Sequence, residues 1–449
     1  MSELMVSVAG IRGIVGESLT PNVIQRYISA YSRLMGEGAI VVGRDSRLSG
    51  KAVSDLVCST LNLCGRDVID IDIATTPTVA LAIELYKAAG GIAITASHNP
   101  AEWNALKFMN QNTLFLDSEE GEKLHYILTE NRFIYAQYDM IGSTTSEKEE
   151  ARKHHIQKIL DIPYISRSEI RKRNFKVALD CVNGAGGVIL PALLHDFGCS
   201  VTKINCEPTG VFAHGAEPLP ENLEEICSVI KGGNYDIGMV VDPDSDRLAL
   251  ISENGVPLGE EYTLAMVTDL VLSKVRSDIA VNVSTSRATE DVASRYGLKT
   301  YRTRVGEINV SKLMLEKGLI IGGEGNGGVI LPEIHPGRDA LVGAALVLQY
   351  LTEKNKFVSD IISELPEYHI VKDKVNIEGL DFEEKSRYIL QNTPEKDTDL
   401  TDGIKINGDF SWVQMRKSNT EPIVRIFAEA RTKEEASELV DKYRRMICD

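Results

Sequence analysis

Short apolar runs, each followed by a polar loop and a helical stretch, recur along most of the chain. Such runs lie at residues 41–42, 92–94, 177–179, 237–241, 279–281 and 319–321. Alternation of strands with helices is typical of a mainly parallel sheet covered by helices. Because the alternation recurs, we expect three related α/β domains with mainly parallel mixed sheets, each offering loops at one sheet edge.

The two ends of the chain show further patterns. At the start, a strand at 4–8 should run into the glycine-flanked Arg12, before Thr20-Pro21 opens a helix. A linker-like stretch at 353–357 precedes strands at 368–377, 404–407, 412–415 and 423–428 and helices at 382–392 and 433–446, a smaller α+β pattern. The expected domains are 1–145, 146–248, 249–356 and 357–449.

Length and composition restrict the class of protein. A chain of 449 residues is too long for one core, which agrees with several domains. Its net charge of −16 argues against a nucleic-acid partner and against an anionic membrane surface, since both require a positive face. The seven cysteines form no Cys-x-x-Cys motif, and no signal peptide is apparent, so we expect reduced thiols and a cytoplasmic protein. The longest apolar helix, at 340–351, is too short to span a bilayer.

The first unusual loop, Ser97-His98-Asn99-Pro100, follows the apolar run at 92–94. A serine at the carboxyl end of a strand can act as a nucleophile or carry a phosphate if a base, a cation or a metal lowers the cost of its alkoxide. His98 and Lys107 are nearby candidates for that assistance. Taken alone, the segment favours an ordinary polar turn without chemistry, and three further segments reverse that preference.

The second unusual loop contains Asp242, Asp244 and Asp246 on a short turn between two apolar runs. Three alternating carboxylates can bind one hard cation and leave positions for a phosphate oxygen or water. The spacing fails the calcium-hand template, which requires glycine at position six and glutamate at position twelve; counted from Asp242, these positions are Arg247 and Glu253. A small, carboxylate-rich site of this kind favours Mg²⁺, and the alternative is a solvated acidic turn.

Two more loops can contact a ligand. The glycine-rich segment 322–328 lets the backbone approach closely and presents Glu324 and Asn326 to hydroxyl groups. The segment from Arg416 to Arg425 combines cations with hydroxyls and amides, and so favours binding of a phosphate dianion; the alternative is a hairpin with a basic tip.

In order and spacing, the segments 95–100, 242–247, 323–327 and 416–422 resemble the motifs of the α-D-phosphohexomutase superfamily. The resemblance implies four domains arranged as a heart around a central cleft, with the C-terminal domain more mobile. It also implies reversible conversion of a hexose 1-phosphate to the 6-phosphate through a hexose 1,6-bisphosphate, which also serves as activator. The implied partner is therefore a phosphosugar, for a monomer or homodimer without nucleic acid or membrane.

The resemblance also implies a role for individual residues. Ser97 would be the phosphoserine and, with Asp242, Asp244 and Asp246, a Mg²⁺ ligand. Arg12, Lys107 and His98 would lie at the catalytic centre, and either Lys107 or His98 could be the general acid and base. The expected substrate-binding residues are Arg247, Gly306, Glu324 and Asn326, and the expected phosphate-binding residues are Arg416, Ser418, Asn419, Thr420 and Arg425.

The chain departs from the common form of the family's sugar loop, Gly-Glu-x-Ser-Gly-His. Asn326 stands in the place of the serine and Gly328 in the place of the histidine, so a histidine contribution from that position is in doubt. The form found here resembles archaeal-type phosphoglucosamine and phosphomannose mutases, and we favour glucosamine over glucose and mannose phosphates. A metal-dependent sugar-phosphate phosphatase and a catalytically silent sugar-phosphate sensor are the alternatives from other functional classes.

Overall fold

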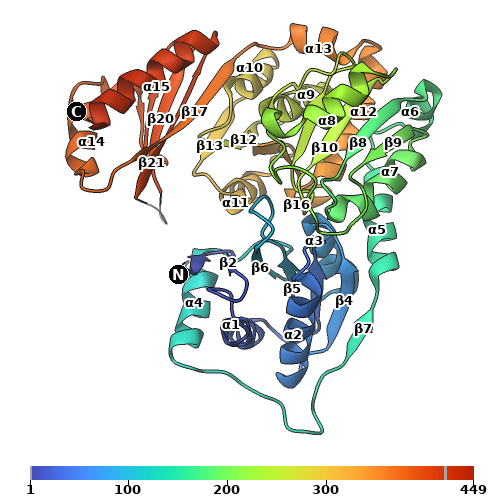
Figure 1. The fold of residues 1–449 in the computed structure, drawn as a ribbon. Coiled ribbons are helices and arrows are strands. Elements are labelled where there is room, and N and C mark those ends of the chain that lie inside the picture. Colours follow the sequence, from blue (N-terminus) through green and yellow to red (C-terminus); the bar gives the residue numbers. More distant parts are fainter. Residues whose placement is uncertain (1–2, 419–421, 449) are drawn as a thin grey trace.

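The computed structural model describes residues 3–418 and 422–448, which fold around four β-sheets (Figure 1). The first three sheets mix parallel and antiparallel strand pairs, whereas the fourth is antiparallel throughout. This confirms the predicted fold class of α/β domains followed by a C-terminal α+β domain. In Figure 1 the first domain (blue) lies at the bottom, and the C-terminal domain (red) lies beside the third domain at the top left.

The first sheet has seven strands in the order β1-β2-β6-β5-β3-β4-β7. On β3, Ile40 and Val42 point into a core shared with α1, α2 and α4, whereas Val41 points into the opposite core with α3. This alternation explains why a fully apolar run forms a strand covered on both faces. The elements are β1 (Met5–Ser7), β2 (Gly10–Ile14), α1 (Pro21–Leu34), β3 (Ile40–Arg44), α2 (Gly50–Leu63), β4 (Val68–Ile73), α3 (Thr76–Tyr86), β5 (Gly90–Ile94), β6 (Trp103–Asn110), α4 (Ser118–Thr129) and β7 (Thr144–Ser146).

Two strands of this sheet differ from the prediction. The strand expected at 4–8 is only β1, and the glycine-flanked segment after it forms β2, so Arg12 lies within a strand. The pattern did not predict β6 either, which pairs with β2 and β5 in antiparallel fashion. Because this pairing places Arg12 opposite Ala105 and Gly10 opposite Lys107, it brings the two expected active-site cations to the same part of the sheet.

The second sheet has the order β11-β10-β8-β9. Leu179 and Met239 face the largest apolar core of the protein, and Ala178 and Val240 face a smaller one that includes α8. The elements that precede or build this domain are α5 (Lys148–Leu160), α6 (Arg167–Arg173), β8 (Lys176–Asp180), η1 (Ala185–Val188), α7 (Leu190–Asp196), β9 (Ser200–Ile204), η2 (Pro220–Asn222), α8 (Glu224–Lys231), β10 (Ile237–Val241) and β11 (Leu248–Ile251).

The third sheet has the order β13-β12-β14-β15-β16. The strand predicted at 319–321 is wrong by a few residues, because Gly322 and Gly323 pair with Ala280 and Val281 and thereby form β14. Its elements are α9 (Glu260–Lys274), β12 (Ile279–Asn282), α10 (Arg287–Arg295), β13 (Thr300–Thr303), α11 (Glu307–Lys317), β14 (Gly322–Glu324), β15 (Gly328–Leu331), β16 (His335–Arg338), α12 (Ala340–Lys354) and α13 (Val358–Glu364). Among the described helices, none is both long and apolar enough to cross a membrane.

The C-terminal sheet has the order β17-β21-β20-β19-β18. Its own core, which includes Val424 and Ile426, is closed by α14 and α15, in agreement with the predicted amphipathic helix at the end of the chain. The elements are β17 (His369–Asn376), α14 (Phe382–Gln391), η3 (Glu395–Asp397), β18 (Thr398–Asp399), β19 (Ile404–Asn407), β20 (Trp412–Lys417), β21 (Ile423–Ala430) and α15 (Lys433–Cys448).

The sheets suggest where the domains meet. We propose that the second domain extends past the expected limit at 248, because β11 (Leu248–Ile251) pairs with β10 in the second sheet. The segment expected to begin the C-terminal domain forms α13, and its Val358 and Ile361 pack into the core shared by the second and third domains. We therefore propose that the C-terminal domain begins near β17.

A buried polar contact joins the first three domains. His155 of α5 lies within hydrogen-bonding distance of Asp339 Oδ2 through Nε2 (2.8 Å) and of the Thr78 hydroxyl through Nδ1 (2.9 Å). Asp339 also accepts a hydrogen bond from His335 Nε2 (3.2 Å), and its Oδ1 caps α12. Burial alone would raise the pKa of Asp339, but His155 and His335 outweigh burial and lower it. The ionised carboxylate therefore stabilises the arrangement of three domains.

We expect His155→Leu to lower the free energy of unfolding by about 2–4 kcal/mol, because a buried carboxylate loses a charge-assisted partner. Since folding lowers the pKa of Asp339, this contribution is complete above the unfolded value of about 4 and is lost as pH falls below it. The difference from wild type, measured by urea denaturation, should therefore shrink in acid. The exposed His125 provides a control, His125→Leu, which should change stability by less than about 0.5 kcal/mol. Equal losses in the two variants would contradict this role of His155.

Candidate active site

Ser97 lies on the loop that leaves β5, at the edge of the first sheet. It has a positive φ of 49°, and its N–H donates to the Thr95 hydroxyl at 2.9 Å. Its own hydroxyl donates to Asp242 Oδ2 at 2.7 Å, across the boundary between the first and second domains. A left-handed conformation is uncommon for serine and is found where the surrounding contacts determine the backbone. The fold therefore holds the Ser97 hydroxyl against the acidic loop.

Arg47 supplies many of those surrounding contacts. Its guanidinium donates to the backbone carbonyl oxygens of Ser97 (2.6 Å) and Asn99 (2.7 Å), and also to those of Pro100 (2.5 Å) and Trp103 (3.0 Å). Asp45 orients it through Nε at 3.0 Å. Arg47 is 1% exposed, so these carbonyls have an internal partner in place of water. The sequence analysis did not identify Arg47, although it follows another strand end.

The three predicted aspartates converge at the end of β10. Asp242, Asp244 and Asp246 are all fully buried, and one carboxylate oxygen from each lies within 4.8 Å of the other two. Asp244 Oδ2 accepts from Lys107 Nζ (2.7 Å) and from the Thr76 hydroxyl (2.6 Å). The loop is therefore a buried cluster and not a solvated turn.

The cluster has the properties of a cation site. The Oδ1 atoms of Asp244 and Asp246 are buried without a hydrogen-bond donor. Burial raises the pKa of Asp242, and the neighbouring carboxylates of Asp246 and Asp244 raise it further. Burial also disfavours ionisation of Asp244, but Lys107 and Thr76 outweigh burial and lower its pKa. Buried carboxylate oxygens that face one another without donors are the ligands a hard divalent cation requires, so the residues present fit a bound metal ion.

Other residues expected at the catalytic centre lie around Ser97. Arg12 Nη1 donates to the Asn99 side chain at 2.9 Å, on the same loop. His98 Nδ1 lies 3.4 Å from the Ser97 hydroxyl. Burial, together with the charges of Arg247 and Arg12, lowers the pKa of His98 to about 2, so its imidazole is neutral at pH 7.

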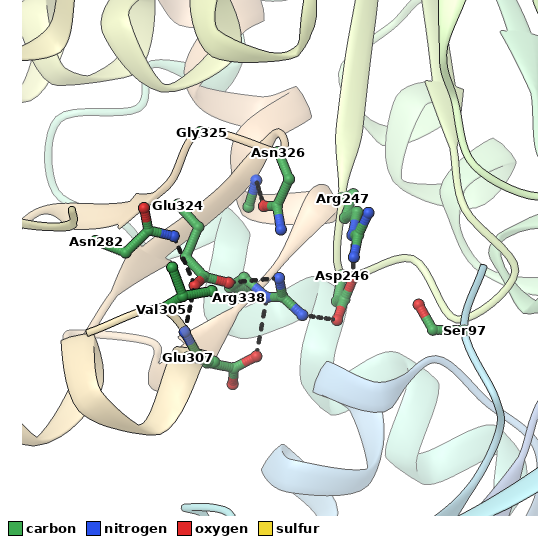
Figure 2. A network of polar contacts seen from close by, with 12 residues as sticks. Ser97, Asp246, Arg247, Asn282, Val305, Glu307, Glu324, Gly325, Asn326 and Arg338 are labelled. Atoms are coloured by element: carbon green, nitrogen blue, oxygen red, sulfur yellow. Dashed lines mark hydrogen bonds and ion pairs between the residues drawn. The ribbon is translucent and has the colours of Figure 1, made fainter. Parts of the chain in front are cut away.

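The sugar-loop residues are joined to the acidic loop through Arg338 (Figure 2). Arg338 Nη1 donates to Glu324 Oε2 at 2.7 Å, and Nη2 donates to Asp246 Oδ2 at 2.5 Å. Glu324 Oε1 accepts from the backbone N–H of Gly306 at 2.9 Å and from the Asn282 side chain at 2.8 Å. Gly306 and Glu324, both expected to bind substrate, are therefore in direct contact.

Two further expected substrate-binding residues lie beside this network. Asn326 is partly exposed, and its Oδ1 accepts from the backbone N–H of Gly328 at 3.2 Å. Arg247 donates through Nη1 to Glu217 Oε1 at 2.6 Å, whereas its buried Nε has no hydrogen-bond acceptor. This Nε lies 3.8 Å from Asp246 Oδ1, so Arg247 forms an ion pair with the acidic loop while one of its donors makes no hydrogen bond (Figure 2).

The Arg416 segment contacts the third domain. Arg416 Nη1 donates to Asp402 Oδ2 at 3.2 Å, and the same oxygen accepts from the backbone N–H of Val305 at 3.0 Å. Arg425, on the neighbouring strand β21, lies opposite Arg416 and is exposed. Asp402, which the sequence analysis did not identify, thereby links the expected phosphate loop to the residue before Gly306.

The tip of this segment includes the other expected phosphate-binding residues. The backbone N–H of Ser418 donates to the Ile423 carbonyl at 2.9 Å, which closes the hairpin between β20 and β21. Asn419 and Thr420 lie outside the described residues. In the part that the structure describes, Arg416 is thus tied to the third domain, while Ser97, Lys107 and the three aspartates form one cluster.

Comparison with known proteins identifies the family. Four domain models of the phosphoglucomutase/phosphomannomutase family match residues 4–134 (α/β/α domain I), 153–255 (α/β/α domain II), 259–368 (α/β/α domain III) and 374–446 (C-terminal domain). The chain belongs to this family, and hence to the α-D-phosphohexomutase superfamily that its motifs resemble.

Individual relatives match over nearly the whole chain. The phosphoglucomutase/phosphomannomutase of Thermococcus kodakarensis is 37% identical, with 96% of each chain covered. A probable phosphoglucosamine mutase of Methanopyrus kandleri is 33% identical, with coverage of 97% of this chain and 96% of the relative. The crystal structure of a phosphoglucomutase/phosphomannomutase family protein from Burkholderia thailandensis has a TM-score of 0.84 at 24% identity, with 98% and 97% of the two chains covered, and supports the fold.

We expect Arg47→Lys to lower turnover in a hexose-phosphate mutase assay by about 100-fold, because lysine cannot hold the Ser97 loop at several points and small displacements of a reacting group are costly. Arg44→Lys is the matched control, since Arg44 ends β3 just before the loop of Arg47 and makes a partly exposed ion pair with Asp72. The control should retain nearly full turnover. Arg47→Lys kinetics equal to those of the control would show that Arg47 does not position the loop.

Proposed function

We propose that this protein is a phosphohexomutase that interconverts hexose 1-phosphates and 6-phosphates through a phosphoserine at Ser97. The observation that carries the proposal is the buried hydrogen bond from the Ser97 hydroxyl to Asp242, within a carboxylate cluster that has unpartnered oxygens. A nucleophilic hydroxyl beside a cation site, with Lys107 at the same carboxylates, is the arrangement that phosphoryl transfer requires.

The chemistry follows from this geometry in two half-reactions. A sugar hydroxyl attacks the phosphorus carried by Ser97, the bond to Oγ breaks as the new bond forms, and a hexose 1,6-bisphosphate results. The bisphosphate then turns around and returns its other phosphate to Ser97. For the proton of the sugar hydroxyl we propose Lys107, because the lowered pKa of His98 makes its imidazole a weak base. Free hexose 1,6-bisphosphate would act as activator by phosphorylating Ser97.

We propose Mg²⁺ as the cation, held by Asp242, Asp244 and Asp246 together with the phosphate on Ser97. When bound, this ion would neutralise the charge of the aspartates and of the transferring phosphate. The compact, all-oxygen donor set supports a hard divalent ion. The remaining positive charges serve the substrate: Arg247 has one donor without a hydrogen bond beside this loop, and Arg416 and Arg425 would bind the phosphate that is not transferred.

We propose glucosamine phosphate as the preferred substrate. The sugar loop has the Gly-Glu-Gly-Asn-Gly-Gly form, and the relative from Methanopyrus kandleri is named a probable phosphoglucosamine mutase. The Thermococcus relative carries the name phosphoglucomutase/phosphomannomutase, so glucose and mannose phosphates are the alternatives to test. The free thiols of the seven cysteines support a cytoplasmic location.

The two alternatives from other functional classes have less support. A phosphatase has no need for a basic loop that retains a bisphosphate, and the relatives are mutases by name. A silent sensor would not require Ser97 to be held against the buried aspartates.

The decisive experiment supplies glucosamine, mannose and glucose 1-phosphates with a trace of hexose 1,6-bisphosphate and separates the products. We expect the 6-phosphate isomer to form with no inorganic phosphate, fastest from glucosamine 1-phosphate. Exhaustive chelation should stop the reaction and Mg²⁺ should restore it. Ser97→Ala should lose both the protein-bound phosphate, measured by intact mass, and the activity. Stoichiometric inorganic phosphate from the wild type would overturn the mutase proposal in favour of hydrolysis.

The Arg416 loop provides a separate prediction. If Arg416 binds the phosphate that is not transferred, Arg416→Ala should raise KM for every phosphosugar, because one charge-assisted contact is worth roughly 1.5–3 kcal/mol. It should also release free hexose bisphosphate, which can be measured during turnover. Arg304→Ala is a suitable control, since Arg304 Nε contacts the Thr401 carbonyl beside Asp402 at an exposed position. Kinetics of Arg416→Ala that match this control would remove Arg416 from the site.

A further inference from the structure

Arg338 forms ion pairs with three carboxylates from different parts of the site (Figure 2). Nη2 donates to Asp246 at 2.5 Å, Nη1 to Glu324 at 2.7 Å and Nε to Glu307 at 3.0 Å. Its side chain is only 11% exposed. Because each contact uses a different nitrogen of one planar group, the guanidinium fixes the directions of the three carboxylates relative to one another.

The contacts leave selected oxygen atoms available. Arg338 binds Oδ2 of Asp246, while Oδ1 of the same residue is buried without a hydrogen-bond donor and lies 3.8 Å from Arg247 Nε. Glu324 is held on its other side by Gly306 and Asn282. Arg338 therefore fixes the orientation of the Asp246 carboxylate, which belongs to the cluster of three aspartates, and the position of the Glu324 carboxylate of the sugar loop.

The residue at 328 makes room for this arrangement. A Cβ atom at Gly328 would lie 2.2 Å from Cδ and 2.9 Å from Cγ of Arg338, which is far too close. The aliphatic part of the Arg338 side chain thus occupies the space that a side chain at 328 would need. The observed position of Arg338 therefore requires glycine at 328.

We propose that Arg338 is the positioning residue that aligns Asp246 with the cation and Glu324 with the sugar, and that Gly328 is required for it. This inference rests on the proposed function for the identity of the cation and the sugar. It assigns to β16 a role in metal and substrate affinity that needs no contact between Arg338 and either one. Loss of such a partner of a ligating carboxylate commonly weakens metal binding by 10–100-fold.

Titration of the protein with Mg²⁺ alone, by calorimetry, tests the first half of the proposal. Arg338→Lys keeps the positive charge but lacks the rigid planar fork that fixes three carboxylates at once, so its Kd for Mg²⁺ should rise about tenfold or more. Arg338→Met should also bind Mg²⁺ more weakly. If Arg338 acted only through its charge, the lysine variant would match wild type and the methionine variant would bind Mg²⁺ more tightly, and that result would overturn the proposal.

A stability control distinguishes the positioning role of Arg338 from a purely structural one. Arg66→Lys alters another arginine with several hydrogen bonds, to the Ser32, Met35 and Gly36 carbonyls of the first domain, and should lower the melting temperature without changing Kd. All titrations are made at a temperature at which circular dichroism shows each variant folded. A lowered melting temperature in Arg338→Lys with an unchanged Kd would contradict the positioning role.

Gly328→Ala tests the second part of the proposal, that Arg338 requires glycine at position 328. Because the added methyl group would collide with the aliphatic part of the Arg338 side chain, this variant should also raise the Kd for Mg²⁺ about tenfold. In the Arg338→Ala background the same change should have little further effect, since the two nearest atoms that it would meet are gone and only Asn326 Oδ1, at 3.0 Å, remains. Gly36→Ala, at a glycine with open space around it, is the control and should bind Mg²⁺ as wild type does. Additive effects of the two changes would refute the dependence on Gly328.

Substrate kinetics complete the test and separate it from the proposed function. With glucosamine 1-phosphate at saturating Mg²⁺, Arg338→Lys should raise KM several-fold, because Glu324 loses its orientation. If wild type is a mutase and Arg338→Lys matches it in Kd and KM, this inference is wrong and the proposed function stands. If wild type shows no mutase activity but its Mg²⁺ affinity depends on Arg338 as described, the alignment of Asp246 stands and the proposed function does not.

Discussion

The buried cluster of Asp242, Asp244 and Asp246 is the constraint on which the rest of the site depends. Like charges in a low-dielectric interior repel one another and lose their hydration, so the fold must supply compensating groups. Lys107 comes from the first domain and Arg338 from the third, while the backbone N–H groups of residues 246 and 247 come from the loop itself. Groups from three domains thus neutralise this one loop. The carboxylate oxygens that remain without a hydrogen-bond donor are those that a cation would bind.

The contact between Ser97 and the acidic loop also requires a constrained backbone. Ser97 must approach Asp242 closely, and it does so with a left-handed backbone held by Arg47 and Thr95. A second uncommon backbone conformation lies in the second domain. The buried Val182 has a φ of 48°, an unusual value for a β-branched residue. The loop of Val182 packs beneath the acidic loop through the hydrogen bond from Ala185 to the Pro243 carbonyl at 2.7 Å. Two uncommon backbone conformations, at Ser97 and at Val182, therefore lie in segments that contact the acidic loop.

The sequence was sufficient to predict those features whose residues are contiguous in the chain. Ser97 and the three aspartates each follow a recognisable apolar strand, and the repeated pattern predicted the α/β class. It was insufficient where long-range pairing decides the structure: β6 gains its strand conformation from β2 and β5, and β14 forms from glycines that have low strand propensity. Arg47 and Arg338 were missed for the same reason. Each lies beside an ordinary polar segment, and its partners are distant in the sequence, so only the folded chain shows what it binds.

Residues 282–285, at the end of β12, contact both the sugar loop and the C-terminal domain. Asn282 and Thr285 contact the sugar loop at Glu324 (2.8 Å) and at the Gly325 N–H (3.1 Å). Between them, Ser284 donates to Gln414 of β20 (2.6 Å) and the Val283 carbonyl accepts from the buried Lys405 (2.6 Å). Gln414 is two residues from Arg416 on the same strand. Because the sugar loop and the strand that carries Arg416 are anchored to one four-residue segment, a rotation of the C-terminal domain must either break these buried hydrogen bonds or move the sugar loop with it.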